Sequence, residues 1–235
     1  AALAGLAVLS GGPALALGGA AVSTSGWGLS DHVVMVLGTR GSVCTGTVLS
    51  PTVIVTAAHC TAGSKQLAVA YFEDGRPILQ QVAAVARNPG FSAKTAVSVD
   101  VALLRLDQRL PSRFRALTMD GGSAATTIGE SLVIAGYGLA EERNYKSAGT
   151  LRTAKVDLLP KVYPRFLRLG LTGRLDDLAI CKGDSGGPVL SGSMVLVGVV
   201  YAAERTGKAK TCGATAQAVR LAPQRAWIDG ILARW

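Results

Sequence analysis

Short apolar runs separated by turn residues set the pattern of the chain from Val33 onward. Runs of a few residues, rich in Val, Leu and Ile and evenly spaced, are typical of strands in an all-β sandwich or barrel. We predict strands at Val33–Leu37, Gly46–Leu49, Val53–Thr56, Leu67–Tyr71, Leu79–Val85, Val101–Leu106, Ser131–Ala135, Leu151–Leu158, Pro188–Leu190 and Met194–Tyr201.

Helical signals are sparse by comparison. A turn is expected at Ala57–Thr61. One helix is expected near the carboxyl end, where Pro223 can begin it and apolar residues recur every four positions, at Trp227, Ile231 and Trp235. No repeat, linker or change of composition marks independent domains. The strand count also fits a pair of barrels joined by a crossover between about Asp107 and Gly129.

The first 22 residues form a nearly unbroken apolar stretch, and residues 1–30 contain no charged side chain. Small residues at Ala14–Ala16 and Gly19–Ala21 are suitable for signal-peptidase cleavage. We therefore predict a cleaved secretion signal at residues 1–21, with a retained membrane anchor as the alternative. Since no basic region precedes the stretch, we expect further residues before Ala1.

Composition excludes a disordered chain, because hydrophobic residues make up 49% and charged residues only 17%. The net charge of +9 would suit an anionic surface or an acidic partner. No phosphate-binding glycine loop of the Walker type occurs and aromatic residues are only 5%, so we expect no specific nucleic acid.

The four cysteines are Cys44, Cys60, Cys181 and Cys212. They fall into two local pairs without the CxxC spacing of a zinc site, which favours two disulfides and an exported protein, secreted or periplasmic. We predict no metal site and no cofactor, and His32 is interpreted as a surface residue rather than a ligand.

Three segments carry candidate chemistry. His59 follows an apolar strand, Ser185 stands among glycines in Gly183–Pro188, and Asp100 precedes the apolar run at Val101. A nucleophilic serine needs a base, a group that orients the base, and donors for the oxyanion. Taken singly, each residue also has a structural interpretation, as a histidine beside a cysteine, a plain glycine turn and a buried carboxylate.

Taken in order, the segments TAAHC, DVALL and GDSGGP resemble the chymotrypsin/trypsin family of serine endopeptidases. The segments CTGTV at residues 44–48 and GYG at 136–138 are also similar to family strands, so the resemblance covers about residues 22–235. It implies two six-stranded antiparallel Greek-key β-barrels with the site between them, and disulfides Cys44–Cys60 and Cys181–Cys212. The first barrel is expected at about 22–118, the second at 119–222 and the helix at 223–235.

The resemblance implies that Ser185 is the nucleophile, His59 its base and Asp100 the residue that orients the base. The amides of Gly183 and Ser185 would form the oxyanion hole. The family's activating ion pair would fall on Asp184, but the family's aliphatic amino-terminal tetrapeptide with two glycines is not found. We expect a new amino terminus at Ala21 or Val22, created by signal cleavage, to take that place.

The specificity pocket departs from the family pattern. Its floor is expected at Ala179 with Ile180 beside it, where enzymes that cut after Lys or Arg carry an aspartate, and its walls at Ala203 and Ala216, where wide pockets have glycine. This combination predicts cleavage after small or medium apolar residues. The remaining pocket residues are Lys182 at the mouth, and Tyr201, which would either crowd Asp100 or donate a hydrogen bond to it.

The sequence therefore predicts a secreted, monomeric serine endopeptidase acting on proteins or peptides. Two alternatives stay open: a catalytically silent binding protein of the same fold, and an enzyme specific for Arg or Lys in which a shifted loop brings Asp177, next to Asp176, to the pocket floor.

Overall fold

The computed structural model describes residues 21–22, 28–39, 41–95, 98–122, 127–160, 164–171, 180–204 and 211–235. Ala179, Asp176, Asp177 and the apolar segment 1–20 lie outside these residues. None of the helices described is long and apolar enough to cross a bilayer.

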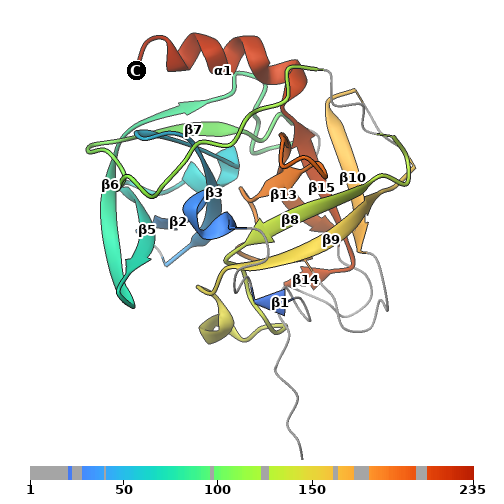
Figure 1. Cartoon of the computed structure of the whole chain (residues 1–235), viewed down its shortest axis with the longest axis horizontal. Helices are drawn as coiled ribbons and strands as arrows, with labels where there is room; N and C mark the ends of the chain where they lie inside the picture. Colours follow the sequence, from blue (N-terminus) through green and yellow to red (C-terminus); the bar gives the residue numbers. More distant parts are fainter. Residues whose placement is uncertain are drawn as a thin grey trace, which may run out of the picture.

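Six strands of the first half close into an antiparallel barrel (Figure 1). Valine and isoleucine alternate between its two faces, so that Ile54 points into the barrel while Val53 and Val55 point outward toward the second half. Around the barrel the strands follow the order β2 (Val33–Gly38), β3 (Val43–Ser50), β4 (Val53–Thr56), β7 (Ala102–Leu106), β6 (Arg76–Arg87) and β5 (Leu67–Glu73).

The second barrel contains β8 (Ser131–Gly136), β9 (Arg152–Leu158), β10 (Phe166–Leu171), β15 (Thr215–Arg220), β13 (Leu196–Glu204) and β12 (Pro188–Leu190), and the pairing of β12 with β8 closes it. Two short strands, β11 (Ile180–Cys181) and β14 (Cys212–Gly213), pair beside it. The predicted fold of two six-stranded antiparallel barrels is thus confirmed.

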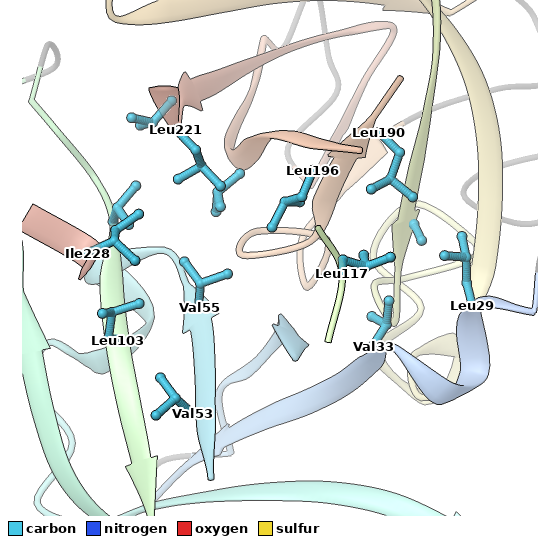
Figure 2. Packing of buried hydrophobic residues seen from close by; sticks show 14 of the residues in the cluster. Leu29, Val33, Val53, Val55, Leu103, Leu117, Leu190, Leu196, Leu221 and Ile228 are labelled. Carbon is cyan, nitrogen blue, oxygen red and sulfur yellow. The ribbon is translucent and has the colours of Figure 1, made fainter. Parts of the chain in front are cut away.

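The largest apolar cluster lies between the barrels (Figure 2). Val55 and Leu103 enter it from the first barrel, Leu190 and Leu196 from the second. Ile228 of the helix α1 (Arg225–Leu232) completes it, so the helix packs across both halves. This shared core holds the facing loops of the two barrels in a fixed relation.

Some element boundaries differ from the prediction. The helix α1 begins at Arg225, because Pro223 lies in a short 3₁₀ turn, η4 (Ala222–Gln224), that precedes it. The strand β1 (Ala21–Val22) pairs with Thr153 and Arg152 of β9, so Val22 joins the second barrel rather than the first. The strands β10 and β15 were not predicted, because polar side chains such as Arg168 and Gln217 interrupt their apolar pattern.

Candidate active site

His59 and Asp100 come from two connections of the first barrel and meet at its rim. His59 lies in the 3₁₀ turn η2 (Ala58–Thr61) directly after β4, and Asp100 lies two residues before β7. The Asp100 Oδ2 lies 2.7 Å from His59 Nδ1, and Oδ1 accepts the His59 backbone N–H at 2.8 Å. The carboxylate side chain is 9% exposed and the imidazole 41%. Asp100 therefore fixes both the ring and the turn that carries it, and it leaves Nε2 free of the carboxylate.

Ser185 lies in the loop between β11 and β12 of the second barrel. Its Oγ donates to the carbonyl of Tyr201 at 3.3 Å and, among the described residues, makes no hydrogen bond with His59. The two residues nevertheless meet at one disulfide: the Cys60 Sγ lies 3.6 Å from His59 Nε2 and 3.8 Å from the Ser185 carbonyl oxygen. Catalytic hydrogen bonds are often long in structures without substrate and tighten when it binds.

The turn around Ser185 depends on glycine. Gly183 has φ +105° and Gly186 has φ +89°, a region that side chains disfavour. In the part of the chain that the structure describes, neither the Gly183 nor the Ser185 amide donates a hydrogen bond. Two neighbouring amide donors without an acceptor are suited to bind a developing negative charge.

Replacement of Gly186 by alanine is expected to lower the free energy of unfolding by about 3 kcal/mol, from backbone strain and overpacking together. A Cβ there would lie 1.9 Å from the Thr45 carbonyl oxygen and 2.2 Å from Thr56 Oγ1. The measurement is urea unfolding. Gly63→Ala is the control, since Gly63 has φ +74° but no atom near its Cβ, and it should cost about 1 kcal/mol. Equal losses in the two variants would contradict the steric explanation.

Asp184 directly precedes Ser185 in the serine loop, and its side chain is buried. Its carboxylate accepts the backbone N–H of Gly138 at 2.9 Å and that of Cys181 at 2.8 Å. Burial raises the pKa of Asp184 to about 7, against the lowering effect of these two bonds and of the Arg152 guanidinium. The predicted ion pair with an inserted amino terminus stays a prediction, and a terminus at Ala21 or Val22 would have to undo the pairing of β1 with β9.

Three of the predicted pocket residues belong to one apolar cluster of the second barrel. Ala203 on β13 pairs directly with Ala216 on β15, and Ile180 packs in the same cluster. The disulfide Cys181–Cys212 joins β11 to β14 beside them, and Lys182 lies exposed with its Nζ 5.2 Å from the centre of the Tyr145 ring. The role of these residues as walls of a specificity pocket stays a prediction.

Of the two contacts considered for Tyr201, the structure gives its hydroxyl a partner other than Asp100, and the crowding of Asp100 stays a prediction. Its hydroxyl donates to the side chain of Gln217, and its ring lies 6.0 Å from that of Phe166. The register of β13 against β15 shifts between Val200 and Ala202, so Tyr201 lies at a bulge. Burial, followed by the negative charges of Asp100 and Glu204, raises the pKa of Tyr201 to about 12, so Asp100 remains within electrostatic reach of the hydroxyl.

Beyond Tyr201, a polar network that the sequence did not indicate covers the outer face of β13 and β15. Gln217 and Arg168 both donate to Glu204, whose pKa the Arg168 hydrogen bond lowers most, to about 2. The sequence signal that could have revealed this network is the set of polar residues, such as Arg168 and Gln217, that interrupt the apolar pattern of the strands.

A group with the ligand types of a metal site, Cys44, His59 and Cys60, brings its ligand atoms within 4.8 Å of one another. Both sulfur atoms are joined to each other in the disulfide, so they offer no thiolate to a metal. His32 Nδ1 donates a hydrogen bond to the Arg115 carbonyl oxygen at 2.6 Å.

Comparisons with known proteins show the family of the chain. The Trypsin family model matches residues 17–228. The chain is 30% identical to Trypsin alpha of Drosophila erecta over 174 residues, which is 67% of this chain and 66% of that one. It is 28% identical to Trypsin delta of the same fly over 200 residues, 79% of this chain and 77% of that one.

Solved structures share the fold. The serine protease neuropsin from mouse brain superposes with a TM-score of 0.71 at 18% identity, over 87% of this chain and 96% of that one. Human heparin binding protein gives a TM-score of 0.73 at 20% identity, over 88% of this chain and 93% of that one.

Proposed function

Because the chain belongs to the trypsin family of serine endopeptidases, we propose that it hydrolyses peptide bonds through Ser185, His59 and Asp100. The observation that carries the proposal is the pair of hydrogen bonds that His59 donates to the Asp100 carboxylate, from Nδ1 at 2.7 Å and from the backbone N–H at 2.8 Å. Beside it lies a serine loop in which the Gly183 and Ser185 amides have no hydrogen-bond partner among the described residues. The imidazole is thereby held with Nδ1 protonated and Nε2 ready to accept a proton.

The reaction runs in two halves. The Ser185 Oγ attacks the carbonyl carbon of the substrate while His59 Nε2 takes the hydroxyl proton, and the amides of Gly183 and Ser185 bind the negative oxygen of the tetrahedral intermediate. The C–N bond then breaks and the amine leaves with the proton from Nε2. Water, losing a proton to Nε2, attacks the acyl-enzyme, and the acid product leaves as Ser185 regains its proton.

The pocket is proposed to accept small or medium apolar side chains on the acyl side of the cleaved bond. The methyl groups of the paired Ala203 and Ala216 narrow the slot, and Ile180 makes it apolar. The floor at Ala179 lies outside the described residues, so the register of the floor stays a prediction.

Replacement of Ala216 by glycine should widen the slot and shift cleavage toward larger apolar residues by roughly tenfold relative to alanine, since one methylene is worth about 1–3 kcal/mol in an apolar pocket. The measurement is cleavage-site profiling of a peptide library with the wild type and the variant. Ala218→Gly on the same strand is the matched control, because Ala218 is also buried in this cluster and pairs with Val200. Cleavage after Arg or Lys by the wild type would instead indicate that Asp177 reaches the pocket.

Export is part of the proposal, because two disulfides in a chain of this size are typical of an oxidising compartment. Protein or peptide substrates follow from the family. The proposal of an anionic partner rests only on the net charge of +9. No feature of the described residues bears on the monomeric state, so both the partner and the monomer stay predictions.

A further inference from the structure

Thr45 of β3 belongs to the first barrel but contacts the serine loop of the second. Its side chain is fully buried. The backbone N–H of Thr45 donates to the Ser185 carbonyl at 2.8 Å, and its hydroxyl donates to the Gly183 carbonyl, also at 2.8 Å. One residue therefore holds the carbonyl groups of both residues whose amides are proposed to bind the oxyanion.

The hydroxyl of Thr45 is itself held in place. Its oxygen accepts the backbone N–H of Tyr137 at 3.0 Å, which leaves its hydrogen for Gly183. The Thr45 carbonyl accepts the hydroxyl of Thr56 at 2.7 Å. A side chain with a fixed donor and a fixed acceptor can impose an orientation rather than follow one.

Gly183 needs such a restraint more than other residues do. With φ at +105° and no side chain, its two flanking peptides can rotate more freely than those of any other residue type. An oxyanion site contributes to catalysis only when its donors are already oriented before charge develops. The Gly183 carbonyl belongs to the peptide that follows Gly183, whereas the Gly183 N–H belongs to the peptide that precedes it. The preceding peptide is held at the Lys182 carbonyl, which accepts the backbone N–H of Leu139 at 3.0 Å. The bond from Thr45 holds the following peptide, so the two bonds together restrict rotation about both backbone torsions of Gly183 and thereby the direction of its N–H.

We propose that Thr45 is a positioning residue for the oxyanion site, with its hydroxyl holding the Gly183 carbonyl so that the Gly183 amide faces the cleft. The inference rests on the proposed function, since it needs Ser185 to be the nucleophile. It predicts that the hydroxyl acts on the transition state and not on substrate binding.

The same strand provides a matched control. Thr47 lies two residues further along β3, is likewise fully buried, and its hydroxyl has no hydrogen-bond partner in the described residues. Thr45→Val and Thr47→Val are thus the same chemical change at neighbouring buried sites, and only the first removes a bond to the serine loop.

The experiment compares the wild type, Thr45→Val, Thr45→Ser and Thr47→Val on one peptide substrate, with enzyme concentration set by active-site titration. Inhibition by a peptide aldehyde, whose adduct with the serine carries an oxyanion, is measured beside inhibition by the matching peptide alcohol, which has none. In Thr45→Val we expect kcat and the affinity for the aldehyde to fall together by about 10- to 100-fold. This loss is at most near the fall in kcat of about 100- to 1000-fold that follows removal of a whole oxyanion donor. The KM and the alcohol affinity should change less than threefold, Thr45→Ser should recover most of the loss, and Thr47→Val should resemble the wild type.

The outcomes separate two failures. A wild type that neither cleaves peptides nor binds the aldehyde overturns the proposed function itself. An active wild type whose Thr45→Val and Thr47→Val variants have equal kcat and equal aldehyde affinity overturns only the role of Thr45, even if both variants unfold at a lower temperature. If Thr45→Val does not fold, Thr45→Ala removes the same hydroxyl with less volume, and wild-type aldehyde affinity in that variant would likewise overturn the inference.

Discussion

Ser185→Ala is expected to lower kcat/KM for peptide hydrolysis by roughly 10⁶-fold, the loss seen when the nucleophile of such a triad is removed. The reason is chemical, because alanine has no oxygen to form the acyl-enzyme and His59 and Asp100 have nothing to activate. The fold should be unaffected: the Ser185 side chain makes one hydrogen bond, to the Tyr201 carbonyl at 3.3 Å. The measurement is kcat/KM on a peptide substrate, with thermal unfolding as the test of the fold.

The same variant separates an enzyme from a silent binding protein. A fluorophosphonate should label the wild type once per chain and leave Ser185→Ala unlabelled, because the reagent forms its bond with an activated serine oxygen. Residual activity within a hundredfold of the wild type, or equal labelling of the two proteins, would remove Ser185 from the proposed role.

Asp100→Asn should reduce kcat/KM by about 10⁴-fold, as replacement of the buried carboxylate does in enzymes with this triad. Asp100 accepts two hydrogen bonds, from His59 Nδ1–H and from the His59 backbone N–H. Asparagine has a single oxygen acceptor, and its amide group placed against Nδ1 would favour the tautomer that carries the proton on Nε2. In that tautomer the imidazole cannot take the proton of Ser185.

Asp107→Asn is the control, because Asp107 is an exposed carboxylate shortly after β7 in the same barrel. Both variants lose one negative charge, and only Asp100→Asn should lose activity. A loss below about tenfold in Asp100→Asn would contradict an orienting role for the carboxylate, and an equal loss in Asp107→Asn would point to the charge of the barrel as a whole.

The site residues that could be predicted from the sequence are those that lie in short segments with a recognisable local pattern. His59 follows a strand, Asp100 precedes one and Ser185 stands between glycines, so each carries its own local signal. The strand pattern indicated an all-β sandwich or barrel and fitted a pair of barrels, and the family resemblance implied the two six-stranded barrels that the structure has. Residues of this kind reveal their surroundings through their immediate neighbours.

The rest depends on contacts between distant parts of the chain. Thr45 lies 92 residues from Tyr137 and 138 residues from Gly183, and a buried threonine in a strand gives no sign of either partner. The hydrogen-bond partner of the Tyr201 hydroxyl, Gln217, lies on another strand, and a bulge of one residue changes the face on which a side chain lies, so the sequence did not indicate this bond. The strands β10 and β15 were missed because Arg168 and Gln217 interrupt their apolar pattern. The partner that satisfies both polar side chains, Glu204, lies on a third strand, β13, and could not be read from the neighbouring residues.

The division of the site between two barrels also determines at which stage of folding the complete site can form. His59 and Asp100 are supplied by the first barrel and Ser185 by the second. The apolar layer between the barrels holds the two halves together (Figure 2). A nascent chain that has folded only its first half holds a base without a nucleophile. On the proposed mechanism, peptide hydrolysis requires that the two halves have docked, so incompletely folded copies of the chain should be unable to cleave one another.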